Sequence, residues 1–369
     1  MRDLVPQISQ WFSEGKQLAV ATVIGTRGSS LRGLGAKMVF AENGLIAGSL
    51  SGGCVEGAVF EAGLQVLQTG RPRRLHFGRA DEDDWGVVGL SCGGQIEVFI
   101  NRLDEDFFRR LNERLLAGRP FFLATLLDGP ADLVGQQIML SDTFQPDRYV
   151  LPALVDAIRV CGQSISSTTT AWSVPLRSLQ GEPVEAFVEA VDSQPTLVIV
   201  GATHIAVTLV TIAKTLGYRT IVIDPRGAFG NAERFPHVDQ LLSYWPQAAF
   251  ERIAVDHNTA IVMLTHDAKL DDPALEIALQ SPAFYVGALG SAHTQKSRRT
   301  RLLRKGVQPD QLDALYGPVG LDLGGETPAE IALEIMAEIV AVQCRASRWE
   351  TGSGCMQWNS PEVSVGERH

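Results

Sequence analysis

Cysteine is scarce in this chain of 369 residues, which has five, at positions 54, 92, 161, 344 and 355. The number is odd, and no two of them form a CxxC motif or a short cluster with histidine. This pattern disfavours a disulfide framework and a structural zinc site. Free thiols fit a reducing compartment, so we expect a cytoplasmic protein.

Positive charge and long apolar runs are also in short supply. A formal net charge of -10 disfavours a general nucleic-acid binder. The longest uncharged apolar stretch, residues 196–213, is interrupted by Gly201 and His204 and fits a strand-turn-helix better than a membrane span. The first residues also lack the basic start and apolar core of a signal peptide. We therefore expect partners that are neither nucleic acid nor membrane.

What remains is the composition of an ordinary globular protein, and its patterning predicts two domains and a tail. We expect an N-terminal α+β or α/β domain at 1–191, a Rossmann-like doubly wound parallel sheet at 196–346, and a polar, mobile tail at 347–369. The apolar patterns predict strands at 18–24, 36–40, 45–49, 74–77, 95–100, 121–127, 138–140, 185–191, 196–200, 220–223, 260–264 and 283–286, with helices at 55–67, 107–116, 151–160 and from 328 onward.

The chain is organised around a glycine-rich turn at residues 47–56, AGSLSGGCVE. Glycines at 48, 52 and 53 allow a tight turn and a close approach to a ligand. Free amides around Ser51, at the start of the next helix, would point into that space and bind an anion. Cys54 lies beside a helix N-terminus, where the pKa of a thiol tends to fall. The alternative is a plain strand-to-helix turn with Cys54 as a small buried residue.

Two further glycine-rich loops lie in the same half. Residues 25–35 carry Arg27, Ser29 and Arg32, and the hairpin predicted around Asn43 brings the end of this loop close to Gly48. Residues 89–94 carry Cys92 and Gly93, where Cys92 is either a functional or a packed thiol.

The second half contains an imperfect dinucleotide motif. Residues 200–206 align with G-x-G-x-x-A, but Thr203 replaces the middle glycine that lets a pyrophosphate approach. Asp224 stands where an acid can bind a ribose hydroxyl. With Gly201 and His204 it would serve an NAD(P)-dependent oxidoreductase; otherwise the fold holds another phosphate-bearing ligand or none.

Several strand ends direct polar or glycine-rich turns toward the same crevice, where open α/β sheets bind ligands. The candidate residues there are His204, Asp224, Arg226, His266, Gly290, Ser291 and, in a later loop, Asp322. The helix after Ser291 has six positive residues between 296 and 305. They either form a solvated face or meet an acidic partner or a phosphate.

In their order, these loops resemble the xanthine dehydrogenase accessory protein family (XdhC/CoxI). The matching stretches lie at 27–30, 35–38, 48–56, 92–94, 201–204, 224–226, 265–266, 287–291, 320–324 and 327–332. The resemblance spans roughly residues 15–345. Leu31 stands where the family often has proline, and Thr203 replaces the usual glycine, which weakens a dinucleotide site.

The resemblance implies a chaperone, not itself an enzyme, that binds the molybdenum cofactor as molybdopterin. Such proteins assist sulfuration of the cofactor and deliver it to an apo xanthine dehydrogenase-type molybdenum hydroxylase. The implied partners are that hydroxylase and a cysteine desulfurase, with a possible homodimer and a role in purine catabolism. The cargo is an anionic pterin with a terminal phosphate and a thiolate-bound metal centre.

Applied to this chain, the resemblance predicts one guest held between loops of both halves, with Cys54 and Cys92 as metal contacts. The predicted binding set is Arg27, Ser29, Gly48, Ser51, Gly52, Gly53, Cys54, Cys92, Gly93, Gly201, His204, Asp224, Arg226, His266, Gly290, Ser291 and Asp322. Two other functions stay open: the NAD(P)-dependent oxidoreductase and a non-catalytic scaffold that recruits a sulfur donor and the target enzyme.

Overall fold

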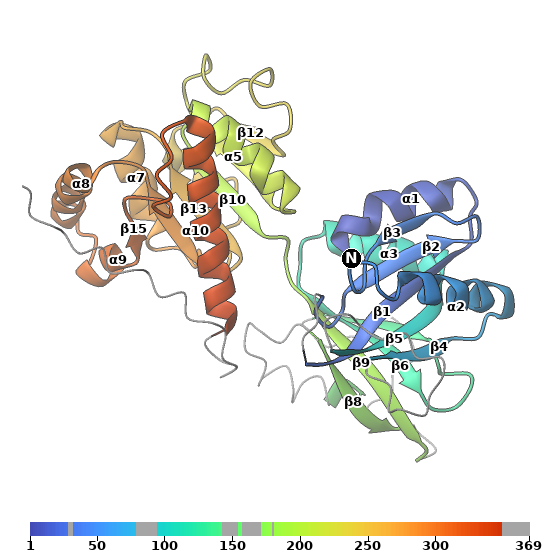
Figure 1. The fold of residues 1–369 in the computed structure, drawn as a ribbon. Helices are drawn as coiled ribbons and strands as arrows, with labels where there is room; N and C mark the ends of the chain where they lie inside the picture. Colours follow the sequence, from blue (N-terminus) through green and yellow to red (C-terminus); the bar gives the residue numbers. More distant parts are fainter. Residues whose placement is uncertain (29–31, 79–93, 142–153, 157–170, 179–180, 349–369) are drawn as a thin grey trace, which may run out of the picture.

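The computed structural model describes residues 1–28, 32–78, 94–141, 154–156, 171–178 and 181–348 (Figure 1). Predictions for Ser29, Cys92 and Gly93, for most of the helix at 151–160 and for nearly all of the tail therefore lie outside the described residues. Within them, the strands form three sheets.

The first sheet is antiparallel and carries helices on both faces. Its order is β3-β2-β1-β5-β4, with β1 (Leu18–Arg27), β2 (Lys37–Ala41), β3 (Ile46–Gly48), β4 (Arg73–Phe77) and β5 (Gln95–Leu103). Side chains alternate along β1: Ala19, Ala21 and Val23 pack with α2 (Glu56–Thr69), while Leu18 and Val20 face the side of α1 (Val5–Ser13) and α3 (Glu105–Leu116). The predicted hairpin at Asn43 is confirmed as the β2–β3 pair.

A second antiparallel sheet completes the N-terminal half. Its order is β7-β6-β9-β8, with β6 (Phe121–Asp128), β7 (Gln137–Ser141), β8 (Ala171–Arg177) and β9 (Pro183–Val191). The sequence pattern missed β8. Among the described residues this strand pairs only with β9 and so lies at an edge of the sheet. An edge tolerates Pro175, which weakens the strand pattern in the sequence.

The third sheet is parallel and confirms the doubly wound, Rossmann-like expectation. Its order is β12-β11-β10-β13-β14-β15, with β10 (Thr196–Val200), β11 (Arg219–Ile223), β12 (Gln240–Leu242), β13 (Thr259–Met263), β14 (Tyr285–Ala288) and β15 (Leu315–Tyr316). One face is covered by α5 (His204–Thr215) and α10 (Pro328–Arg348). The other is covered by α6 (Pro246–Phe250), α7 (Ala268–Ala278), α8 (Ala292–Arg304) and α9 (Pro309–Asp313).

The helix α10 begins at the predicted capping box. The Thr327 amide donates to the Glu330 carboxylate at 2.8 Å, and the Glu330 amide donates to the Thr327 hydroxyl at 3.3 Å. Ile335 and Ile339 then lie fully buried in the core beneath it. Among the described residues, no helix combines the length and apolar character that a bilayer crossing needs.

Candidate functional site

The described ends of the glycine-rich loops lie at one end of the first sheet. Because its neighbouring strands are antiparallel, β1, β3 and β4 end where β2 and β5 begin. The Ser49 amide donates to the Lys37 carbonyl at 3.1 Å, which confirms the predicted approach of the first loop to Gly48 and Ser49. A Cβ on Gly28 would lie 3.5 Å from the Cα of Gly94, so these two described glycines also lie close together.

Gly48 is required by this packing. Its φ is +83°, and a Cβ there would lie 2.3 Å from the Lys37 carbonyl oxygen and 3.3 Å from the side chain of Leu4. No other residue type fits both the dihedral angle and the space. The predicted binding residue Gly48 therefore has a structural role.

The turn after Gly48 already holds an anion, which is the carboxylate of Glu56. It accepts hydrogen bonds of 2.7–3.2 Å from seven donors. They are the amides of Leu50, Ser51, Gly52, Gly53 and Val55 and the hydroxyls of Ser49 and Ser51. Burial alone would raise the pKa of Glu56, but these bonds, led by those from Ser51, lower it far below its usual range.

The expectation of free amides for a ligand anion at Ser51, Gly52 and Gly53 was therefore wrong. Glu56 lies in the first turn of the following helix, and its carboxylate accepts the hydrogen bonds of the amides that we expected to bind a ligand. Cys54 lies within this rigid turn. Its amide donates to the Ser51 hydroxyl at 3.1 Å, and its half-buried side chain packs against the core under α2.

Arg27 ends β1 at the same end of the sheet and is exposed. The predicted companion thiol, Cys92, lies outside the described residues, so the pairing of Cys54 with Cys92 stays a prediction. Within the part of the chain that the structure describes, no three His, Cys, Asp or Glu side chains gather into a metal site.

At the carboxyl edge of the parallel sheet, Gly201 serves packing. Its φ is +108°, and a Cβ there would lie 2.3 Å from Cγ2 of Thr265 at the end of the neighbouring strand. Thr203, at the position of the missing glycine, caps α5 by accepting from the Ala206 amide at 3.4 Å. The motif therefore gives a close turn and a helix cap, and no contact within it requires a dinucleotide.

Asp224 is buried and fully engaged. One oxygen accepts from the Ala202 amide at 2.8 Å and from the Arg226 guanidinium at 2.7 Å, and the other accepts from the Arg226 amide and Nε, both at 2.9 Å. Burial would raise the pKa of Asp224, but these bonds, led by those from Arg226, lower it. The prediction that Asp224 binds a ribose hydroxyl gains no support, and neither does NAD(P) as a cofactor.

The other predicted residues of this edge are distributed along it. His204, His266 and Asp322 are exposed, and Gly290 precedes Ser291. As predicted, Ser291 caps its helix, accepting from the Thr294 amide at 3.3 Å.

The basic helix α8 meets an acidic partner within the chain. Its side chains pair in order with those of α7, as Arg298–Asp271 at 3.0 Å, Arg301–Asp272 at 2.8 Å and Lys305–Glu276 at 2.5 Å. Arg298 and Asp271 are both buried. Of the two interpretations left open for these positive residues, a solvated face therefore fits only part of the helix, since three of them pair with acidic side chains of α7.

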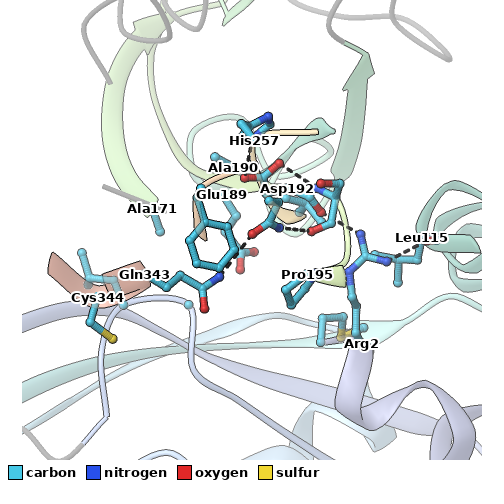
Figure 2. A pocket seen from close by; sticks show the side chains of 17 residues that line it. Arg2, Leu115, Ala171, Glu189, Ala190, Asp192, Pro195, His257, Gln343 and Cys344 are labelled. Carbon is cyan, nitrogen blue, oxygen red and sulfur yellow. Dashed lines mark hydrogen bonds and ion pairs between the residues drawn. The ribbon is translucent and has the colours of Figure 1, made fainter. Parts of the chain in front are cut away.

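The two halves meet at the opposite edge of the parallel sheet. Pro195, Asn258 and Phe284 directly precede β10, β13 and β14, and they line a cavity of about 570 Å³ together with Leu34 and Gly35 of the first glycine-rich loop (Figure 2). A smaller cavity of about 380 Å³ adjoins it and shares these last two residues.

Among the residues that the structure describes, the loops of the two halves do not converge on one crevice, so the prediction of a shared crevice gains no support. The strand β10 spans five residues, about 16 Å at 3.3 Å per residue, between this meeting point and the edge that carries Gly201. The loops of the first half approach the amino edge of the parallel sheet, whereas Asp224, His266 and Ser291 follow its carboxyl ends. The order of strands fixes which edge carries the turns, but only the packing of the halves decides which edge faces the first domain.

Several residues of this region were missed. Lys37 and Glu189 form a buried ion pair at 2.8 Å that joins the first two sheets, and Lys37 also donates to the Thr22 hydroxyl at 3.1 Å. Charged residues inside the strand patterns KMVFA and VEAFVEAV were the available signal, since a buried charge needs a partner. His257 and Cys344 gave no local signal, because only tertiary packing brings them to the cavity.

Comparisons with known proteins cover both halves. The XdhC and CoxI family matches residues 11–78, and the XdhC Rossmann domain matches residues 197–339. The chain is 28% identical over 341 residues to a probable xanthine dehydrogenase subunit of Bacillus subtilis, covering 90% of this chain and 95% of that protein. It is 26% identical over 329 residues to the molybdenum cofactor insertion chaperone PaoD of Escherichia coli, covering 89% and 84%.

A solved structure gives the same picture. A crystal structure described as a xanthine dehydrogenase from Bacillus halodurans matches with a TM-score of 0.73 and 27% identity, over 95% of this chain and 97% of that one. Sequence and fold therefore agree over nearly the whole length. The chain belongs to the XdhC and CoxI family.

Proposed function

We propose that this protein is a molybdenum cofactor chaperone, which binds the molybdopterin form of the cofactor and inserts it into a xanthine dehydrogenase-type molybdenum hydroxylase. The observation that carries the proposal is the similarity to the insertion chaperone PaoD over 89% of this chain. A match of that extent includes both halves and the loops between them.

The geometry at the end of the first sheet supports the same function. A chaperone must hold an anionic, metal-bearing guest firmly and then release it, so it needs rigid turns and a soft donor at the surface. Cys54 is half-buried on a turn fixed by Glu56, and the exposed guanidinium of Arg27 lies at the same end of the sheet. Thiolate sulfur is a suitable ligand for a soft metal centre.

The proposal extends to steps that follow from the family resemblance. We infer that the protein presents the cofactor for sulfuration by a cysteine desulfurase, works in the cytoplasm and forms a homodimer. Each extension stands or falls separately from cofactor insertion.

The decisive experiment is to purify the full chain from cells that make molybdopterin and from cells that cannot. Released pterin and molybdenum are then measured per chain, and the loaded protein is mixed with an apo molybdenum hydroxylase. We expect near-stoichiometric pterin only from the first cells and recovery of hydroxylase activity on mixing. No bound pterin, or pterin that never activates the hydroxylase, would contradict the proposal. Cys54→Ala tests the thiol contact that the sequence predicts: loss of molybdenum supports Cys54 as the metal contact, and unchanged molybdenum loading assigns that contact to another residue.

A further inference from the structure

The two adjoining cavities between the halves have different chemistry. The larger one is lined by apolar residues, among them Phe284 and Pro195, and by polar residues, among them His257, Asn258 and Gln343. At about 570 Å³ it lies within the range of sites for small organic ligands. The free cysteine Cys344, a soft donor, is also one of its lining residues (Figure 2).

The polar groups of the larger cavity are held in place by one another. Asn258 donates to the Ser193 carbonyl at 2.7 Å and accepts from Gln343 at 3.2 Å, while His257 lies 3.2 Å from the carboxylate of Asp192. Such a network presents donors and acceptors in fixed positions. This arrangement suits the edge of a flat heterocycle that carries amino and carbonyl groups.

The smaller cavity is the more basic one. Met1, Asp3 and Arg32 line it, together with Lys37, whose ammonium is already paired with Glu189. Burial alone would raise the pKa of Asp3, but the positive amino terminus lowers it, with a smaller contribution from Arg32. The exposed guanidinium of Arg32 is suited to a phosphate.

Met1, Leu34 and Gly35 line both cavities, so the two adjoin at these residues. Lys37 faces the smaller cavity and its ion-pair partner Glu189 faces the larger one. A Cβ on Gly35 would lie 3.1 Å from a carboxylate oxygen of Glu189. Any larger residue at position 35 would therefore crowd Glu189 where the two cavities adjoin.

We propose that these two cavities together form the cargo site for an anionic pterin, with its phosphate at Arg32 and its ring and metal end in the larger cavity near Cys344. The inference rests on the proposed function, and it assigns the site to the junction of the halves. A guest there touches the first glycine-rich loop, the amino edge of the parallel sheet and α10 at once, so the relative position of the halves controls binding and release.

Exposed residues allow a test that leaves the core intact. Arg32→Glu replaces the positive side chain that lines the smaller cavity with a negative one. Leu34→Trp places a larger side chain where the two cavities adjoin. The matched controls are Lys296→Glu on α8 and Leu216→Trp after α5, both exposed and away from either cavity. All four are purified from molybdopterin-producing cells, checked for an unchanged melting temperature, and assayed for released pterin per chain. We expect at least a tenfold loss in the first two and wild-type loading in the controls.

A second measurement does not depend on variants. Loaded and pterin-free wild-type protein are treated with iodoacetamide, and alkylation of each cysteine is followed by mass spectrometry. We expect bound pterin to slow alkylation of Cys344 at least tenfold. Wild-type loading in Arg32→Glu and Leu34→Trp, or protection of Cys54 without Cys344, overturns the cavity assignment while the chaperone function stands. A wild-type protein that carries no pterin overturns both.

Discussion

Glu56 binds Ser51 through both of its carboxylate oxygens, one 2.9 Å from the Ser51 amide nitrogen and the other 2.7 Å from its hydroxyl. The side chain thus fills a cradle of amides that resembles an anion site for an external ligand. It also fixes the turn that carries Cys54, because the amides of Gly52 and Gly53 donate to the same carboxylate. The rigidity of this turn therefore depends on one acidic side chain.

Replacing Glu56 with glutamine should loosen this turn. Glutamine keeps one acceptor oxygen, but its NH2 group replaces the other and would face amide and hydroxyl donors of the turn. Several of the hydrogen bonds are therefore lost. We expect a loss of about 1–3 kcal/mol in unfolding free energy, the usual size for hydrogen bonds to a charged group. The alkylation rate of Cys54 should change severalfold in the folded protein. Denaturant unfolding and mass spectrometry of labelled Cys54 measure the two effects.

The matched control for that variant is Glu61→Gln, an exposed position on the same helix. It should alter neither quantity. If Glu56→Gln behaved like this control, the carboxylate would not be what holds the turn.

Removing one partner of the Lys37–Glu189 pair should strongly lower the free energy of unfolding, whereas replacing both with apolar residues should lower it little. Glu189→Gln leaves a buried ammonium without its carboxylate, which typically costs about 3–5 kcal/mol. The double variant Lys37→Met with Glu189→Leu removes both charges and should recover most of that loss. Equilibrium unfolding of Lys37→Met, of Glu189→Leu and of the double variant that combines them gives the coupling. A double variant as unstable as the sum of the single ones would refute this account.

Alanine substitutions at Gly201 and Gly217 distinguish the effect of backbone strain from that of steric clash on the free energy of unfolding. Both have positive φ, but a Cβ on Gly217 meets nothing within 4 Å, whereas one on Gly201 meets Thr265 at 2.3 Å. Gly217→Ala should cost about 1–2 kcal/mol, and Gly201→Ala clearly more. Thr265→Ser removes the offending methyl group and should partly rescue Gly201→Ala. Equal losses in the two alanine variants would argue against the clash.

The buried Asp271 should give a distinct pH dependence. Burial raises its pKa to about 6, although the Thr265 hydroxyl and the charge of Arg298 act in the opposite direction. Between about pH 4 and 6 the folded protein then holds a proton that the unfolded chain releases, so rising pH destabilises the fold. Relative to Asp271→Asn, wild-type unfolding free energy should fall by about 2 kcal/mol from pH 4 to 7.

Thr265→Val sharpens that measurement. It removes the hydroxyl that donates to the Asp271 carboxylate, so the sloping part of the stability curve should move to higher pH. A wild-type curve parallel to that of Asp271→Asn across this range would show that the buried carboxyl keeps an ordinary pKa.

Much of the local structure of this protein could be predicted from its residues alone. Hydrophobic period and turn residues located the strand-helix alternation of the second half, the hairpin at Asn43 and the capping box at Thr327, because each depends on neighbours within a few residues. The order of the motifs also identified the family. The strand β8 was not predicted, because a proline such as Pro175 is compatible with a strand at a sheet edge, and the sequence does not show where the edge lies.

Which group occupies each site, in contrast, depends on how the folded chain packs. Glu56 takes the amides expected to serve a ligand, and Arg226 takes the carboxylate of Asp224, because side chains close by in space compete with any guest. The halves meet at the amino edge of the parallel sheet, so Arg32 and Cys344, far apart in sequence, line neighbouring cavities. No local pattern encodes such a meeting, since it depends on how whole layers pack against one another.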